Sequence, residues 1–157
     1  MPNPEQYRAV HMLFRRIFRD YSPAVTPKSI DEAVIDLTDT LCLYKGTITD
    51  IGKEIKKRFR EEIGEWMQCS IGVSTNRFLA KLAASLHKPD GLDIIDHTNV
   101  LDVYNHVSLL DLSGINTRFQ ARLNAYGIFT PMEFYTAPLD LLKKQVFQSI
   151  LGYYACE

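Results

Sequence analysis

The sequence is poor in cysteine and has no long apolar run, and each shortage excludes a class of protein. Its three cysteines stand far apart without a CxxC pair, which excludes a disulfide framework and a cysteine zinc site. No apolar run approaches the roughly 20 residues that a membrane helix needs, so we expect no membrane partner. The arginine-rich N-terminus lacks the continuous apolar centre of a secretory signal. These absences favour a reduced, cytoplasmic location.

The chain also has little net charge. It carries 18 lysines and arginines against 19 aspartates and glutamates, which gives a formal net charge of −1. This balance excludes a uniformly basic nucleic-acid binder, so any contact with a polyanion must be local. With 157 residues and neither internal repeats nor low-complexity segments, the chain suits one ordinary domain or two small ones.

Apolar spacing predicts three helices in the first part of the chain. Apolar side chains recur every three or four residues from about Pro4 to Asp20, which indicates an amphipathic helix. A second helix is predicted after Thr47, which with Asp50 resembles a capping box, and a third from an Asn76 cap to residue 86. The basic side chains predicted on the outer face of the second helix are Lys53, Lys56, Lys57, Arg58 and Arg60.

Extended segments are predicted between these helices. The runs "AVTPKSI" and "AVIDLTD" flank Asp31 and Glu32, and we predict a β-hairpin with both acids near its tip. Two further strands are predicted, a short buried one in "MQCSIGVST" and one in "LDII". The turn "KPDG" separates the third helix from the last strand, with Gly91 as the residue that tolerates a positive φ. After residue 95 the sequence predicts only short helices joined by Gly or Pro turns.

The adjacent carboxylates of Asp31 and Glu32 are the first candidate for chemistry. Neighbouring carboxylates repel each other, and a divalent cation removes that conflict. Mg²⁺ prefers oxygen ligands and is commonly held by one or two carboxylates together with substrate phosphates. The alternative is an ordinary solvated turn, because Asp-Glu pairs are common.

Two longer motifs point to a family. "SIDEAVIDLTD", followed by "SIGVSTNRFLAKLAASLHKPDGL", closely resembles the two palm signatures of Y-family translesion DNA polymerases, the group that contains bacterial polymerase IV. The resemblance implies that Asp31 and Glu32 are catalytic residues that bind two Mg²⁺ ions. It also implies that Lys88 contacts the nucleotide triphosphate and that the helix bearing Lys81 faces DNA. The alternative for both lysines is an exposed surface position.

A third motif lies in the predicted helical part. "LLDLSGINTRFQARLNAYGIFTPMEF" resembles the helix-hairpin-helix of the polymerase thumb, in which backbone N–H groups bind a DNA phosphate. The family usually has a second glycine where this chain has Asn116, which would visit left-handed geometry. The alternative is an ordinary helical hairpin capped by Gly114 and Gly127. The DNA-binding residues implied are Ser113, Gly114, Ile115, Asn116, Thr117 and Arg118, with Arg122 as a further cation.

The expected fold is α+β, with a palm whose antiparallel sheet is flanked by helices over residues 1–95 and a small all-helical thumb over residues 96–157. The family's first catalytic strand and fingers would precede the matched region. The implied activity is transfer of deoxynucleotides to a primer 3′-hydroxyl, and its partners would be primer-template DNA and deoxynucleoside triphosphates. A sliding clamp is a further candidate partner, through a region outside these residues.

We expect little or no polymerisation by these residues alone, because two carboxylates lack their third partner. One alternative is a catalytically silent DNA-binding or partner-binding remnant that uses the thumb hairpin. Another is a nucleotidyl cyclase, which shares a palm-like sheet with paired acids, although the helix-hairpin-helix and the lack of glycines beside Asp31 argue against it.

Overall fold

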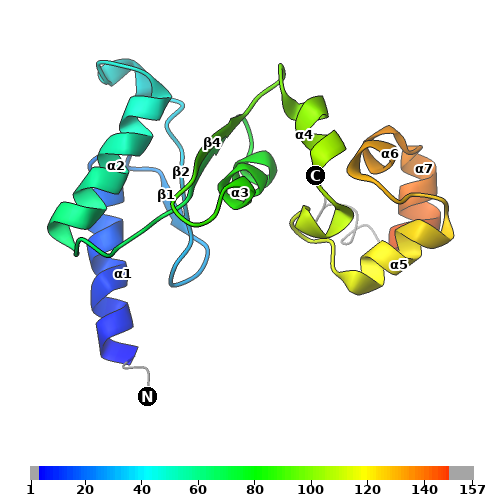
Figure 1. The fold of residues 1–157 in the computed structure, drawn as a ribbon, viewed down its shortest axis with the longest axis horizontal. Helices are drawn as coiled ribbons and strands as arrows, with labels where there is room; N and C mark the ends of the chain where they lie inside the picture. The colour runs from blue at the N-terminus through cyan, green and yellow to red at the C-terminus, as the bar shows by residue number, and fades with distance from the viewer. Residues whose placement is uncertain (1–3, 149–157) are drawn as a thin grey trace. The chain divides into compact units, whose positions relative to one another are not determined.

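The computed structural model describes residues 4–148 and divides the chain into two compact units, Met1–Ser70 and Ile71–Glu157. Figure 1 shows helices in both units and short strands in each. Over the described residues, no helix combines the length and apolarity that a membrane crossing requires. The boundary expected between palm and thumb, after residue 95, stays a prediction.

Two helices that pack against each other form the body of the first unit. They are α1, Pro4–Arg19, and α2, Ile48–Glu62. The predicted capping box is confirmed, because the Thr47 hydroxyl accepts from the Asp50 N–H and the Asp50 carboxylate accepts from the Thr47 N–H. Phe59 of α2 stacks on Phe14 of α1 with ring centroids 4.8 Å apart, and the Phe18 ring lies 5.5 Å from it. The predicted apolar face of the first helix therefore lies in this contact.

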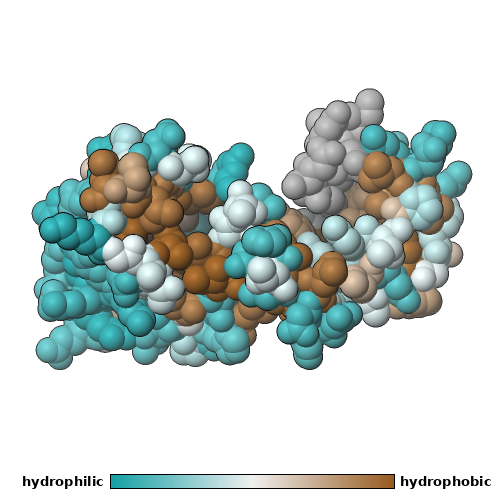
Figure 2. Space-filling model, turned by 90° about the horizontal axis from the view of Figure 1, so that it is seen from above, coloured by the Kyte–Doolittle hydropathy of each residue, from teal (hydrophilic) through white to brown (hydrophobic). Residues whose placement is uncertain are grey.

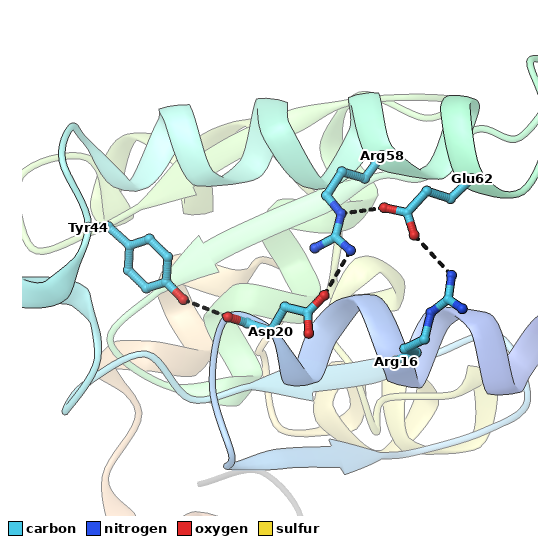
Figure 3. Close-up of polar contacts among 5 residues, drawn as sticks. All are labelled: Arg16, Asp20, Tyr44, Arg58 and Glu62. Atoms are coloured by element: carbon cyan, nitrogen blue, oxygen red, sulfur yellow. Dashed lines mark hydrogen bonds and ion pairs between the residues drawn. The ribbon is translucent and has the colours of Figure 1, made fainter.

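An ion-pair network also joins α1 to α2, and it corrects one prediction (Figure 3). Arg58 was predicted on the outer face of its helix, yet its side chain is only 22% exposed and points toward α1. Its guanidinium donates to Glu62 at 2.5 Å and to Asp20 at 2.8 Å, and Arg16 of α1 donates to Glu62 at 3.1 Å. The hydrogen bond from Arg58 is the main reason that the pKa of Glu62 lies below its ordinary value. Tyr44 extends the network by donating to the Asp20 carbonyl at 3.0 Å.

The predicted hairpin is confirmed in the first unit. Strands β1, Val25–Pro27, and β2, Ala33–Ile35, pair in antiparallel register with Val25 opposite Ile35 and Pro27 opposite Ala33. Pro27 is tolerated because it lies at a strand end in a two-stranded sheet. The 3₁₀ turn η1, Leu41–Leu43, then leads toward α2.

The second unit begins with a strand-helix-strand arrangement. Strands β3, Ile71–Ser74, and β4, Leu92–Ile95, are parallel and joined by α3, Arg77–Leu86, whose predicted Asn76 cap accepts from the Leu79 N–H. The predicted antiparallel pairing is therefore found between β1 and β2, whereas β3 and β4 pair in parallel. A parallel pair needs a crossover connection, and α3 supplies it. The predicted buried strand β3 is in fact half-buried.

Short helices follow β4, as predicted, and share one core with α3 and β4. Leu82, Ala83 and Ile95 from the strand-helix-strand part are almost fully buried against Leu109 and Leu123 of the helical part. The helical elements are α4 Val100–His106, η2 Leu109–Asp111, α5 Thr117–Ala125, α6 Pro131–Thr136, α7 Leu139–Leu141 and the π-helical η3 Leu142–Phe147. This common core explains why the second compact unit begins at β3.

Some large apolar side chains also reach the surface, where Figure 2 shows brown patches among hydrophilic residues. Within residues 4–148 the most exposed are Leu43 and Trp66, with exposed fractions of 76% and 75%. Scattered exposed apolar residues are normal for a folded protein, so they alone indicate no binding surface.

Candidate functional site

The acidic loop, which we define as residues 28–32, joins β1 to β2 and carries the predicted metal ligands. The backbone N–H groups of Lys28 and Ser29 donate to the Glu32 carbonyl at 2.8 and 3.2 Å. These bonds close the hairpin directly beside its last strand pair, Pro27 and Ala33. Asp31 and Glu32 are exposed at this turn, so water screens their mutual repulsion.

Ser29 orients the first of the two acids. Its hydroxyl donates to the Asp31 carboxylate at 2.5 Å, and the Asp31 N–H points back to the same hydroxyl oxygen at 3.4 Å. This local pattern is a side-chain turn of the kind that serine commonly forms. The hydroxyl occupies one lone pair of the carboxylate, and an ionised carboxylate has further acceptor sites for a cation.

The donor set of the acidic loop fits a hard divalent cation. The two carboxylates of Asp31 and Glu32 supply exposed oxygen ligands, which is the ligand type that Mg²⁺ prefers. Across residues 4–148, no group of three or more His, Cys, Asp or Glu side chains is placed to hold a metal. The loop therefore offers two ligands, a number that suits an ion shared with substrate phosphates.

Lys88 lies in the second unit, at the turn between α3 and β4. Its side chain is exposed, so its ammonium group is accessible to a polyphosphate. The predicted positive φ falls on Asp90, at 62°, rather than on Gly91. Gly91 is required for another reason, because a Cβ there would lie 2.3 Å from the His87 carbonyl oxygen. The backbone of Gly91 thus lies close to the residue that follows the end of α3.

Lys81 lies on the exposed side of α3, whose buried side carries Leu82 and Ala83. The helix sits unusually close to β3. A Cβ on Gly72 would lie 2.0 Å from the Ala80 carbonyl oxygen and 2.3 Å from the Ala84 nitrogen. Glycine at this position therefore sets the distance between the helix bearing Lys81 and its strand.

The turn before α5 brings together the predicted thumb residues Ser113 to Arg118. Gly114 has a φ of 93°, which strongly favours glycine, and the Ile115 N–H donates to the Leu112 carbonyl at 3.1 Å. The backbone N–H groups of Gly114, Asn116 and Thr117 donate no hydrogen bond to any residue that the structure describes. Such N–H groups at the start of a helix are suited to an anion.

Asn116 acts differently from the sequence-based prediction. It has extended geometry, with φ −100° and ψ 177°, so it does not replace a left-handed glycine. Instead its side-chain oxygen caps α5 by accepting from the N–H groups of Arg118 and Phe119, both at 3.0 Å. Those two N–H groups are therefore satisfied within the protein.

The two arginines of α5 also differ from each other. Arg118 is exposed in the first turn of the helix. The Arg122 guanidinium instead lies near the Phe119 ring, 5.8 Å from its centroid, and donates to the Val146 carbonyl at 3.5 Å. Arg122 thus packs against its own unit, and Arg118 is the better candidate for a contact with phosphate.

Sequence reasoning missed one residue at the acidic loop. His11 lies on α1 with its Nδ1 atom 2.9 Å from the Ile30 carbonyl oxygen. The residues are 19 positions apart, so no local motif reveals this contact.

One family model and many known proteins are similar to this chain. The model of the impB/mucB/samB family matches residues 1–85, which is more than half of the chain. DNA polymerase IV of Pelotomaculum thermopropionicum is 37% identical over 130 residues, covering 83% of this chain and 32% of the relative. DNA polymerase IV of Moorella thermoacetica is 35% identical over 144 residues, covering 92% of this chain and 35% of the relative.

Solved structures show the same relationship. DinB from Sulfolobus solfataricus has a TM-score of 0.80 and 25% identity, over 98% of this chain and 44% of that one. An insertion ternary complex of Dbh DNA polymerase gives a TM-score of 0.82 with the same identity and coverage. The chain spans about a third of the length of these curated relatives. It belongs to the impB/mucB/samB family, the Y-family DNA polymerases.

Proposed function

We propose that this chain is the palm and thumb portion of a translesion DNA polymerase that transfers deoxynucleotides to a primer 3′-hydroxyl. The observation that carries the proposal is the acidic loop, where Asp31 and Glu32 are exposed side by side and Ser29 orients the first carboxylate. The names of the relatives support the same reaction. In this proposal the palm covers residues 1–95 and the thumb residues 96–157, and the protein acts in the cytoplasm.

Asp31 and Glu32 would hold the Mg²⁺ ions of the reaction. When bound, such ions supply positive charge for the triphosphate and for the developing alkoxide of the primer. The protein's own contribution is to present two oxygen ligands on a closed turn. The hydrogen bond from Ser29 restricts Asp31, and the closed hairpin restricts the backbone that carries Glu32.

The second unit would bind the nucleotide and the DNA backbone. Lys88 offers an exposed ammonium group to the triphosphate, and Lys81 offers one to DNA. Ser113, Gly114 and Ile115 would bring the turn before α5 against a phosphate, and Asn116 and Thr117 supply available N–H groups. Arg118 adds a positive charge in the same helical turn. These contacts involve phosphates, so they carry no base preference.

Metal binding by the acidic loop gives the most direct test. We would titrate the 157-residue chain with Mn²⁺, follow the free ion by electron paramagnetic resonance, and compete with Mg²⁺. Asp31→Asn and Glu32→Gln should each lower the affinity at least tenfold, because each removes one of two charged ligands. Asp39→Asn is the matched control, since it removes an exposed carboxylate of the same unit outside the loop. Equal affinity in all four proteins would refute the assignment.

Primer extension tests the reaction itself. We expect little or no extension by these residues alone, because the chain spans only about a third of its relatives. Any extension that occurs should require Mg²⁺ and disappear in Asp31→Asn. Extension that persists in Asp31→Asn would show that the reacting centre lies elsewhere.

A second candidate is a DNA-binding remnant without catalysis. The turn at Gly114 favours it, because available N–H groups at the start of a helix are suited to phosphate without any metal. This candidate predicts DNA binding that is unchanged in Asp31→Asn, together with no Mn²⁺ binding at the acidic loop. The Mn²⁺ titration therefore separates the two candidates.

A further inference from the structure

We propose that His11 is a positioning residue that anchors the acidic loop to α1, and this inference rests on the proposed metal-binding role of that loop. His11 lies on α1, and its Nδ1 atom lies 2.9 Å from the carbonyl oxygen of Ile30. Ile30 directly precedes Asp31 in the chain. The contact thus fixes the peptide group whose nitrogen belongs to the first metal ligand.

The acidic loop needs such an anchor. Strands β1 and β2 have three residues each and form a two-stranded sheet, and a small isolated hairpin is marginally stable in water. Bonds inside the loop include those from Lys28 and Ser29 to Glu32, and from Ser29 to Asp31. They close the turn on itself, whereas His11 ties it to a helix.

The chemistry of the contact defines which His11 atom carries the proton. A carbonyl oxygen only accepts hydrogen bonds, so Nδ1 must be the donor. The neutral ring with its proton on Nδ1 and the doubly protonated ring both satisfy this requirement. The anchor therefore requires a proton on Nδ1 and places no requirement on Nε2.

A shared surface hollow also places Ile30 beside α1. Ile30 lines this hollow together with Pro4, Tyr7 and Arg8, all from the first turns of α1. Ile30 is 48% exposed, so about half of its surface is covered. The loop therefore bonds to α1 through the Ile30 carbonyl, and the same residue borders a hollow that α1 also lines.

The helix that bears His11 is well supported. Phe14, one turn further along α1, stacks on Phe59 of α2 at 4.8 Å. Arg16 of α1 binds Glu62 of α2 at 3.1 Å. Both apolar and charged contacts fix α1 to α2. A hydrogen bond from His11 to the loop therefore restricts the motion of the loop relative to this helix pair. Loss of the bond should loosen the loop without unfolding the helix pair.

The test compares two substitutions of similar size. His11→Leu removes the donor and keeps an apolar side chain on the helix. His11→Asn keeps a donor, because the asparagine amide nitrogen occupies nearly the position of Nδ1. The matched control is His106→Leu, since His106 makes the same kind of bond through Nδ1, at 2.8 Å, to the Asp102 carbonyl within its own helix.

Two measurements are made on each protein. Amide hydrogen exchange at Lys28 and Ser29 reports opening of the loop, because both groups bond to the Glu32 carbonyl. Mn²⁺ affinity reports the arrangement of the carboxylates. Loss of one hydrogen bond predicts roughly two- to tenfold faster exchange and roughly two- to tenfold weaker Mn²⁺ binding in His11→Leu. His11→Asn and His106→Leu should stay near the unsubstituted protein.

The outcomes separate the anchor from the metal site. Unchanged exchange in His11→Leu, with amides around Phe14 still protected, would overturn the anchoring role. Faster exchange in His11→Leu with Mn²⁺ binding absent from every protein would support the anchor and refute the proposed function. Faster exchange with unchanged Mn²⁺ affinity would overturn the claim that the anchor positions the metal ligands.

Discussion

Replacement of Gly72 by alanine should strongly destabilise the second unit. The added Cβ would lie 2.0 Å from the Ala80 carbonyl oxygen, about 1.4 Å short of ordinary van der Waals contact. It would also lie 2.3 Å from the Ala84 nitrogen. Both neighbours are backbone atoms of α3, so relief requires the whole helix to move away from β3.

The structure sets the size of this effect. The inner side of α3 carries Leu82 and Ala83, which are 1% and 0% exposed, so a shift of the helix opens the core. Overpacking usually costs about 1–3 kcal/mol, and we expect about 3 kcal/mol because no flexible side chain can give way. With a urea dependence of about 1.5 kcal/mol per molar, the unfolding midpoint should fall by about 2 M.

Gly127→Ala is the matched control for this prediction. Gly127 has a φ of 78°, and a Cβ there meets nothing within 4 Å. Its substitution therefore costs only the left-handed backbone penalty of about 1 kcal/mol. Urea unfolding followed by circular dichroism ranks the two proteins. If Gly72→Ala unfolds at the same urea concentration as Gly127→Ala or at a higher one, the close approach of β3 and α3 is wrong.

Three further predictions concern both units. The pKa of Glu62 is lowered chiefly by the hydrogen bond from Arg58, so its stabilising effect is present above the ordinary value of 4.5 and is lost as the pH falls through the folded value. Glu62→Gln should flatten the dependence of the unfolding free energy on pH below about 5, and an unchanged acid titration would contradict this. Gly114→Val should lower DNA affinity several-fold in a filter-binding assay, because valine disfavours a φ of 93° and would distort the turn before α5. Asn116→Ala should lower the free energy of unfolding by about 1 kcal/mol through loss of the helix cap, whereas equal stability in urea would show that the cap is unimportant.

Local features of the fold could be predicted from the sequence. The α1 helix follows from apolar spacing, and the Thr47 and Asn76 caps follow from residue type and position. The hairpin around Asp31 follows from β-branched runs on either side of polar residues. Each of these patterns lies within a few positions along the chain, where backbone geometry and side-chain chemistry act directly.

Contacts between distant residues could not be predicted in the same way. Arg58 belongs to a basic run that is typical of a solvated helix face, yet Asp20 and Glu62 draw it toward α1. Asn116 has a residue type that suits either a left-handed turn or a cap, and the surrounding turn selects the cap. The parallel pairing of β3 with β4 depends on the path of the crossover helix, which periodicity does not encode.

One part of the acidic loop can be predicted from residue type, and another part depends on a contact between distant residues. The distant contact should influence metal affinity. Residue type makes Asp31 and Glu32 candidates for oxygen ligands, and Ser29 a neighbour able to orient one of them. The bond between His11 and Ile30 cannot be predicted from a local sequence pattern, because 19 positions separate the two residues. Substitutions in the packing of α1 on α2 should therefore change metal affinity without altering any ligand. Phe59→Leu, which weakens that packing through the Phe14 contact, should lower Mn²⁺ affinity only while His11 is present. Equal losses of affinity in the presence and absence of His11 would mean that the helix pair supports the loop by another route.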